Sequence, residues 1–395
     1  MLMEKNFALK GQIVYSKSPQ EWATYPNSYL VCRDGLVEGV YPTLPEQFQG
    51  IPVEDVGDNL VIPGLVDLHL HAPQYAYRAL GMDLELLDWL NTHTFPEEAK
   101  YNDLAYAQKA YGMFTAAMVA GATTRASIFA TMHVPATLLL MDMLEDSGLV
   151  TLVGKVNMDR NSIERLTEKD AAISLEDTRK WLAETEQKYS RTRPILTPRF
   201  IPSCSDALME GISRLQKETG LPVQSHLSEN PSEVEWVKEL CPQAQSYADA
   251  YARFGLFGGA VPTIMAHCVY PHGNELELLR DNQVMVAHCP NSNTNLSSGI
   301  APVRLYLEQG IRTGLGTDIA GGFSASIFRT MSDAIQVSKL YWRLVDDSKQ
   351  PLTAQEAFYM GTKGGGQFFG KVGSFEKGYE FDAVVLDDSP LPCPV

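Results

Sequence analysis

The sequence predicts an α/β protein, a (β/α)8 TIM-like barrel with a small flanking β-sandwich layer built from both termini. Two observations favour this fold. Strand-like runs alternate with helix-period stretches from about residue 63 to residue 370, and shorter β-rich runs lie on either side of that region. Eight β runs that alternate with helices are typical of such a barrel. A doubly wound open sheet is the competing fold, but no GxGxxG motif follows the first barrel strand.

The two ends of the chain are predicted to form one small β domain. Residues 1–62 contain three short runs with strand alternation, broken by Gly, Pro and Asp turn signals. Residues 373–395 return to strand character in GSFEKGYEFDAVVLDD (373–388). We therefore expect residues 63–372 to form a barrel that is inserted between the two parts of this domain.

The barrel elements can be assigned in chain order. Its strands are expected at 65–71, 122–129, 151–158, 194–200, 222–228, 263–269, 283–289 and 311–318. Apolar residues recur at helical spacing between them. The clearest of these helical stretches are 103–121, 174–190 and 205–220.

Composition narrows the class of protein. The chain of 395 residues has 32 basic and 48 acidic residues, and the resulting charge of −16 argues against nucleic acid or an anionic membrane as partner. Its six cysteines form no CxxC pair, which argues against a zinc ribbon or a disulfide framework. Neither a signal peptide nor an apolar run of about 20 residues is evident. We therefore expect a soluble protein of a reducing compartment, the cytoplasm.

The sharpest local feature is His69-Leu70-His71, at the end of the first predicted barrel strand. Side chains two residues apart on a strand point to the same face. Both imidazoles are therefore expected at the C-terminal mouth of the barrel, where barrel active sites lie. The alternative is a pair of buried, hydrogen-bonded histidines in a core strand.

Three further strands end in potential ligands. His226 closes PVQSH, His267 closes TIMAH and Asp318 closes IRTGLGTD. Because the ends of parallel barrel strands meet at one mouth, these side chains should converge on the HxH pair. Three imidazoles and a carboxylate suit Zn²⁺ or Fe²⁺, and an open coordination position would make such a site hydrolytic.

Seven motifs give the chain a family resemblance. They are PGLVDLHLHAPQY (63–75), GMDLELLDWLNTHTFPEEAKY (81–101), TPRF (197–200), SHLSEN (225–230), MAHCVY (265–270), AHCPNSNTNLSSG (287–299) and GLGTDIAGG (314–322). With these motifs the chain resembles the amidohydrolase superfamily and, within it, the guanine deaminases. The resemblance covers about residues 55–388, and it narrows to the guanine deaminases through the 81–101 run, the Gln of HAPQY and TPRF.

The resemblance implies an activity and a set of site residues. The activity is hydrolytic deamination of guanine at C2 to xanthine and ammonia, with one zinc ion per chain, Fe²⁺ being the other candidate, in an enzyme that forms homodimers. The implied metal ligands are His69, His71, His226 and Asp318. The implied catalytic residues are Glu229, which would protonate a purine ring nitrogen, His267, which would orient the water, and Asp318, which would shuttle the proton.

The residues implied to bind guanine extend beyond the catalytic set. Gln74, Arg199 and Phe200 look like the side chains that read the purine. His226, Glu229, His267 and Asp318 would also face the substrate.

Several alternatives stay open at this point. The same fold could act on another N-heterocyclic amine, such as a pterin, a triazine or cytosine, or it could be a non-catalytic scaffold. Lys155 could bridge a binuclear metal site, whereas His288, Ser292 and Asn293 are expected to support the site from behind. Members of the family usually continue beyond the FDAVVLD run, so we expect the C-terminal part of the β domain, which stops at Val395, to be incomplete or small.

Overall fold

The computed structural model describes residues 6–387 and residue 389, and the chain divides into two compact units. One unit comprises residues 67–352, and the other combines the residues before 67 with those from 353 onward. The sequence leads us to expect boundaries at 62/63 and 372/373, whereas the compact units change at 66/67 and 352/353. The main difference is that α13 (Ala354–Tyr359) and the following π-helical turn η7 (Met360–Gly364) belong to the terminal unit.

The terminal unit contains a five-stranded sheet with the order β15-β4-β1-β2-β3. Its strands are β1 (Asn6–Ser18), β2 (Glu21–Arg33), β3 (Leu36–Tyr41), β4 (Val53–Pro63) and β15 (Ala383–Leu386), and the short helix η1 (Glu46–Phe48) precedes β4. Strand β15 pairs antiparallel with β4, which joins the two ends of the chain in one sheet. The Asp34-Gly35 turn between β2 and β3 has both residues at positive φ, 53° and 81°, as a tight hairpin turn requires.

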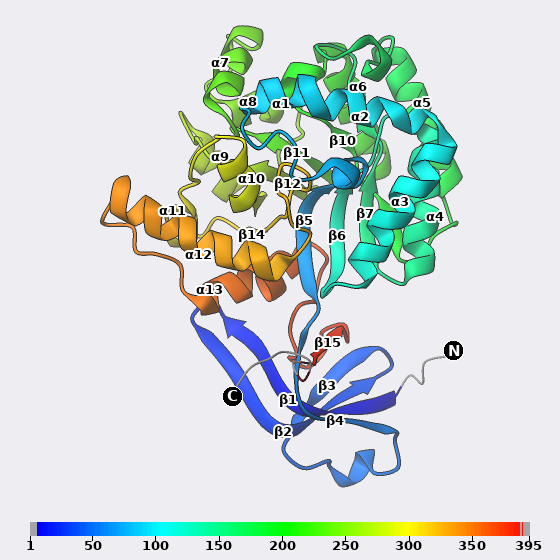
Figure 1. The fold of residues 1–395 in the computed structure, drawn as a ribbon, viewed down its shortest axis with the longest axis vertical. Coiled ribbons are helices and arrows are strands. Elements are labelled where there is room, and N and C mark those ends of the chain that lie inside the picture. The colour runs from blue at the N-terminus through cyan, green and yellow to red at the C-terminus, as the bar shows by residue number, and fades with distance from the viewer. Residues whose placement is uncertain (1–5, 388, 390–395) are drawn as a thin grey trace. The chain divides into compact units, whose positions relative to one another are not determined.

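The barrel unit is built on parallel strands (Figure 1). They are β5 (Leu65–His71), β6 (Thr123–Phe129), β7 (Val150–Gly154), β8 (Val156–Asn157), β9 (Thr192–Pro194), β10 (Thr197–Pro198), β11 (Val223–Leu227), β12 (Thr263–His267), β13 (Met285–His288) and β14 (Thr313–Leu315). The third and fourth expected strands are each split into two short ones. Pro194 and Pro198 contribute to the split of the fourth, because proline has no N–H for the ladder.

Backbone hydrogen bonds connect the barrel strands into a ring. The sheets run β5-β6-β7-β9 and β11-β12-β13-β14, and an isolated parallel bridge between Leu196 and Val223 joins the fourth position to the fifth. Between the first strand, β5, and the segment after the last strand, β14, Asp318 N donates to His69 O at 2.8 Å and His71 N donates to Ile319 O at 3.0 Å. The α/β barrel that the sequence predicts is thus the fold of this unit.

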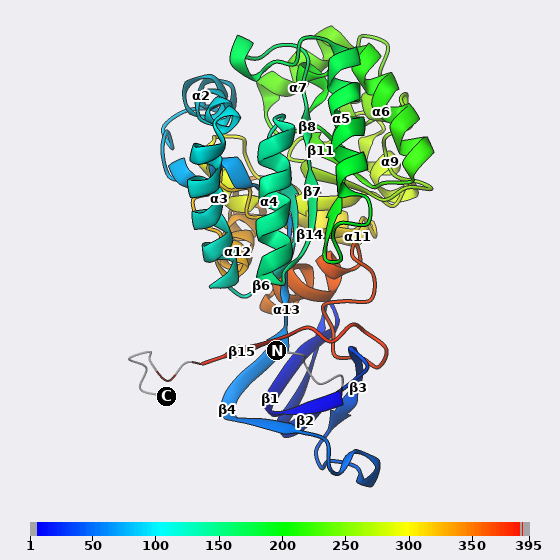
Figure 2. The ribbon, with the colours of Figure 1, turned by 90° about the vertical axis from the view of Figure 1, so that its right-hand side faces the viewer.

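Helices cover the outside of the strands (Figure 2). They are α3 (Leu104–Val119), α4 (Val134–Ser147), α5 (Ala171–Thr185), α6 (Asp206–Thr219), α7 (Pro231–Leu240), α8 (Tyr247–Ala252), α9 (Glu275–Asp281), α10 (Pro290–Asn295), α11 (Val303–Glu308) and α12 (Ile327–Leu344), with short turns η5 (Glu164–Leu166) and η6 (Ile201–Ser203). Phe114, Leu140 and Trp181 from three of these helices pack in one buried cluster with Ile128 of β6. Within the described residues, no helix combines the length and the apolar character needed to cross a membrane.

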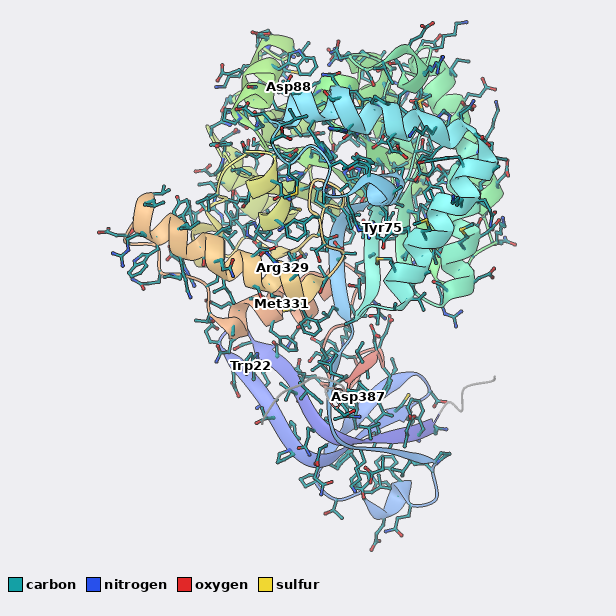
Figure 3. All side chains as sticks on the ribbon, viewed as in Figure 1. Trp22, Tyr75, Asp88, Arg329, Met331 and Asp387 are labelled. Atoms are coloured by element: carbon teal, nitrogen blue, oxygen red, sulfur yellow. The ribbon has the colours of Figure 1, made fainter. Side chains whose placement is uncertain are left out.

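An excursion follows the first barrel strand. It contains η2 (Ala72–Tyr77), α1 (Leu86–Trp89), the π-helical turn η3 (Leu90–Thr94), α2 (Phe95–Glu98) and η4 (Ala99–Asn102). We call residues 81–102 the roof segment, because Leu86, Trp89 and Leu90 line the cavity at the barrel mouth. Asp88 of α1 is exposed (Figure 3).

Asp67 fixes the first strand to the last. Its buried carboxylate accepts hydrogen bonds from Thr317 N at 3.0 Å, from Thr317 Oγ1 at 2.5 Å and from His69 N at 3.2 Å. A buried carboxylate that accepts three hydrogen bonds offsets much of its desolvation cost. This contact therefore sets the register of the two strands that carry His69 and Asp318.

We predict that Asp67→Ala destabilises the barrel, because three buried donors lose their acceptor at about 1–3 kcal/mol each. Urea or thermal unfolding of the variant should show a loss of about 3 kcal/mol or more. Asp347→Ala, at an exposed position of the same unit, is the control and should stay within about 0.5 kcal/mol of the wild type. An Asp67→Ala protein as stable as this control would contradict the assignment.

Candidate functional site at the barrel mouth

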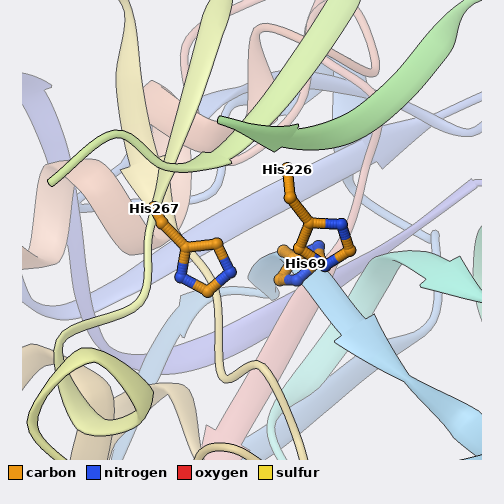
Figure 4. A group of neighbouring side chains, drawn as sticks. All are labelled: His69, His226 and His267. Carbon is orange, nitrogen blue, oxygen red and sulfur yellow. The ribbon is translucent and has the colours of Figure 1, made fainter. Parts of the chain in front are cut away.

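Five side chains from four strand positions meet at the mouth of the barrel. His69 and His71 come from β5, His226 from β11, His267 from the last residue of β12, and Asp318 from the segment after β14. All five are at least nine-tenths buried. Figure 4 shows the rings of His69, His226 and His267 turned toward a common point. The convergence expected from the strand ends is present in the structure.

The donor atoms of these side chains lie at short, similar separations. Asp318 Oδ1 is 3.1 Å from His69 Nε2 and 3.4 Å from His71 Nε2, and His71 Nε2 is 3.2 Å from His226 Nε2. A tetrahedral zinc site with bonds of about 2.0–2.1 Å places its ligand atoms about 3.3–3.4 Å apart. The donor atoms of His69, His71 and Asp318 all lie within 4.8 Å of one another, and His71 Nε2 also lies close to His226 Nε2, so these separations are of the size that one divalent metal ion requires.

The chemistry of the donor set fits a metal as well. His69 Nε2 and His267 Nε2 are buried and have no hydrogen-bond partner among the described residues. Burial first, and then the neighbouring imidazole of His69, lowers the pKa of His71 and of His226 well below the ordinary value. Neutral imidazoles keep the lone pair that a metal needs.

Hydrogen bonds on the far side of two rings fix which nitrogen faces the cluster. His226 Nδ1 lies 2.6 Å from the carbonyl oxygen of Arg199, and His267 Nδ1 lies 2.9 Å from Asn293 Oδ1. Because an oxygen acceptor requires an N–H donor, Nδ1 carries the proton in both rings and Nε2 is left to face the site. Asn293 thus supports the site from behind, as expected.

The backbone is strained where two of the site residues sit. His267 has φ 73° and Asp318 has φ 46°, both in the left-handed region. For a residue with a Cβ this conformation costs about 1–2 kcal/mol. Such strain is tolerated where the surrounding structure fixes the residue, and it occurs often at functional sites.

Glu229 lies beside the cluster with its carboxylate poised toward His267. Its Oε2 is 3.4 Å from His267 Nε2, which in turn lies 3.7 Å from Asp318 Oδ2. Burial first, then the negative charges of Glu233 and Asp318, raise the pKa of Glu229 well above its ordinary value. The raised pKa favours the protonated form of the Glu229 carboxyl, which is the form that can donate a proton.

Glu233 holds the backbone that carries Glu229. As the capping-box residue of α7, it accepts hydrogen bonds through Oε2 from the amides of Glu229 at 2.9 Å and Asn230 at 3.3 Å. Its Oε1 accepts a hydrogen bond from Tyr247 at 2.8 Å. The helix cap therefore fixes the position of Glu229 as well as the start of α7.

One small cavity adjoins the cluster. Its lining includes Gln74, Arg199 and Phe200, all buried, together with the three roof residues. Five side chains of the site also line it: His71, His226, Glu229, His267 and Asp318. Its volume is about 30 Å³, which corresponds to about one water molecule. A larger hollow of about 580 Å³ lies elsewhere, lined by residues of α6 and around α8 such as Asp206, Arg214 and Lys217, and it contains none of these side chains.

Glu98, at the end of α2, was not predicted from the sequence. Its carboxylate is buried and accepts hydrogen bonds from Arg199 Nη1 at 2.6 Å, Arg199 Nη2 at 3.2 Å and Gln74 Nε2 at 2.8 Å. The feature of the sequence that could have indicated this residue is the pair of acidic residues Glu97-Glu98 in the roof segment. That pair does not say which of the two side chains points inward.

Of the remaining candidates, Lys155 has another partner, and His288 and Ser292 have none among the described residues. Lys155 is fully buried and pairs with Glu168, so its ammonium group is already engaged. Burial lowers the pKa of His288 to about 3, and neither of its ring nitrogens has a partner among the described residues. Ser292 Oγ is likewise buried without a described partner.

We predict that the purified chain takes up about one divalent metal ion, measured by elemental analysis after dialysis in non-chelating buffer. His71→Ala should lower the bound metal several-fold, because one of the four closely spaced donors is lost. His272→Ala is the matched control, since this imidazole is part-exposed and lies outside the cluster. Equal metal content in both variants would contradict the proposed ligand set.

Comparison with known proteins shows which family this chain belongs to. The amidohydrolase family pattern matches residues 60–394. The guanine deaminase of Dictyostelium discoideum is 37% identical over 409 residues, which cover 97% of this chain and 90% of that protein. The guanine deaminase of Homo sapiens is 39% identical over 339 residues, covering 84% and 74% respectively.

A solved structure is similar over nearly the whole chain. The guanine deaminase from C. acetobutylicum, solved with guanine bound in its active site, superposes with a TM-score of 0.95 at 46% identity, covering 98% of this chain and 92% of that one. The chain therefore belongs to the amidohydrolase family and, within it, groups with the guanine deaminases.

Proposed function

We propose that this chain is a guanine deaminase that hydrolyses the C2 amine of guanine, giving xanthine and ammonia. The observation that carries the proposal is the single cavity that brings a metal-ligand cluster together with Gln74, Arg199 and Phe200. The relative solved with guanine in its active site, 46% identical over 98% of this chain, supports the same substrate.

The family is metal-dependent, and we propose zinc as the metal, with His69, His71, His226 and Asp318 as its ligands. Three imidazoles and one carboxylate are a donor set that zinc favours and that Fe²⁺ also accepts. When bound, such a metal lowers the pKa of a water molecule from about 15.7 to about 7 and so supplies a strong nucleophile at neutral pH.

Asp318 and His267 handle the proton and the orientation of the attacking water. Burial alone would raise the pKa of Asp318, but its interactions with His69 and then His267 outweigh burial and lower that pKa below its ordinary value. The ionised carboxylate can take a proton from the water and return it to the departing amine. Burial lowers the pKa of His267 to about 4, so its neutral ring faces Asp318 and Glu229 and can hold the water between them.

Glu229 completes the proton transfers on the purine side. Attack at C2 moves electron density onto the neighbouring ring nitrogen, which then needs a proton. Burial and acidic neighbours raise the pKa of Glu229, which favours the protonated carboxyl that would supply this proton. This arrangement separates an ionised base, Asp318, from a protonated acid, Glu229, in one small site.

Three side chains would read the base. The guanidinium of Arg199 presents donors toward the O6 and N7 acceptors of guanine, and the amide of Gln74 can donate to O6 and accept from N1–H. Adenine would present an amino donor against Arg199, leaving buried polar groups unpaired at about 1–3 kcal/mol. Phe200 offers a ring beside the cavity, with its centroid 6.4 Å from that of His226.

The assembly and location also belong to the proposal. We propose a homodimer, as the family resemblance implies, which native mass spectrometry can test. We propose the cytoplasm as its location. The buried thiols of Cys204, Cys241, Cys268 and Cys289 suit a reducing compartment.

We predict that the purified chain releases ammonia from guanine and not from adenine or cytosine, and that a chelator abolishes this activity. Ammonia release across guanine, adenine, cytosine and a pterin, with and without chelator, measures both effects. Arg199→Ala should lower kcat/KM for guanine about tenfold or more, because a buried charged donor is lost.

Other outcomes would favour the alternatives. Ammonia from cytosine or a pterin but not from guanine would assign the site to another N-heterocyclic amine. A purified chain without bound metal and without activity would favour the alternative of a non-catalytic scaffold protein with the same fold. An Arg199→Ala variant with full guanine turnover would contradict the guanine-reading role of Arg199.

We predict that Glu229→Gln lowers kcat for guanine about 10²–10⁴-fold, the usual contribution of a positioned general acid. In the wild type, activity should fall as pH rises through the raised pKa of Glu229, because the needed proton is then lost. The variant should lack this alkaline decline while it retains its bound metal. If Glu229→Gln has the same pH profile as the wild type, Glu229 is not the general acid of the reaction.

A further inference from the structure

The side chain of Glu98 contacts both polar reading residues, Gln74 and Arg199. Its carboxylate forms a two-pronged pair with the Arg199 guanidinium, at 2.6 Å and 3.2 Å, and accepts from Gln74 Nε2 at 2.8 Å. Glu98 is 1% exposed and Arg199 is 3% exposed. The three groups therefore form a buried network of charge-assisted hydrogen bonds, and the bidentate pairing of Glu98 with Arg199 fixes its geometry.

A second contact holds the other end of the Gln74 amide. Ala320 N donates to Gln74 Oε1 at 3.1 Å. A flipped amide would place its NH2 group against the Ala320 N–H and its oxygen against the Glu98 carboxylate. Both contacts would be repulsive, so Glu98 and Ala320 together determine the orientation of the Gln74 amide.

The hydrogen-bonding groups of Gln74 that are not used by Glu98 and Ala320 match one edge of a purine. Gln74 keeps one N–H on its nitrogen and one lone pair on its oxygen, side by side in a fixed order. The 6-oxo edge of guanine presents an acceptor, O6, next to a donor, N1–H. A 6-amino purine presents a donor next to an acceptor, the reverse order, which the fixed amide cannot pair.

We propose that Glu98 is a positioning residue that determines specificity: it fixes the Gln74 amide and holds Arg199, so that the site accepts a 6-oxo purine and rejects a 6-amino purine. The proposal rests on the proposed deamination of guanine. The choice between these purines would then depend on a carboxylate in the roof segment. This carboxylate contacts Gln74 and Arg199 and would not contact the base itself.

The neighbouring acid provides a matched comparison. Glu97 precedes Glu98 on the same helix turn, but its carboxylate pairs with Lys100 at 2.6 Å and accepts a hydrogen bond from Tyr106. Neither partner lines the cavity. Replacing Glu97 by glutamine therefore makes the same chemical change in the same segment without touching the reading residues.

The experiment compares guanine with 2,6-diaminopurine, which carries the same C2 amine but a 6-amino edge. We expect the wild type and Glu97→Gln to prefer guanine strongly, measured as the ratio of kcat/KM values. Glu98→Gln should lower this ratio about tenfold or more, because the amide of Gln74 then loses the charged one of the two contacts that oppose its turning to pair the 6-amino edge. Bound metal, measured in parallel, should be the same in all three proteins.

Each result decides between the proposal and its rivals. If Glu98→Gln lowers both kcat/KM values equally and leaves the ratio unchanged, Glu98 is only structural and the proposal is overturned. If Glu97→Gln lowers the ratio as much, the effect belongs to the roof segment as a whole and the proposal fails. If the wild type releases no ammonia from guanine, the proposed function fails instead.

A second variant keeps the test decisive if Glu98→Gln does not fold. Glu98→Asp retains a negative charge near Arg199, but its shorter side chain draws the carboxylate back from Gln74 Nε2 and Arg199 Nη2, which share Oε1 in the wild type. We expect it to fold, as judged by its melting temperature, and to show a lowered guanine preference. A folded Glu98→Asp protein with the wild-type ratio would overturn the proposal.

Discussion

The backbone hydrogen bonds between residues 69–71 and 318–319 are the constraint on which the site depends. They bring the end of the first strand against the segment after the last one, with the Asp67 carboxylate bound to Thr317 at their base. Because of this seam, two residues almost 250 positions apart place a nitrogen and an oxygen 3.1 Å from each other. The other side chains of the cluster lie on strands that belong to the same ring.

Gathering these groups away from water works against folding. Four imidazoles and the carboxyl groups of Asp318 and Glu229 share one buried region, and the backbone of His267 and Asp318 is strained as well. An unpaired buried polar group costs about 1–3 kcal/mol. A metal held by the proposed ligands would satisfy several of these groups together, so the native state and the bound ion would stabilise each other.

Much of the site can be predicted from the sequence because strands impose simple rules. Alternation puts His69 and His71 on one face, and parallel strands end at one mouth, so His226, His267 and Asp318 join them. Glu98 is different. It reaches Arg199 across 101 positions, from a helix turn of four residues, α2, whose rotation depends on packing in the roof segment. No local pattern distinguishes it from Glu97.

The cavity beside the cluster has room for about one water molecule, whereas a purine has two fused rings. Leu86, Trp89 and Leu90 of the roof segment form part of its wall. A base can therefore reach the cluster of histidines and Asp318 only after part of this wall has moved, and the product can leave only after it moves again. Each catalytic cycle contains that gating motion, so its frequency sets an upper limit on kcat that no improvement of the chemical step can exceed.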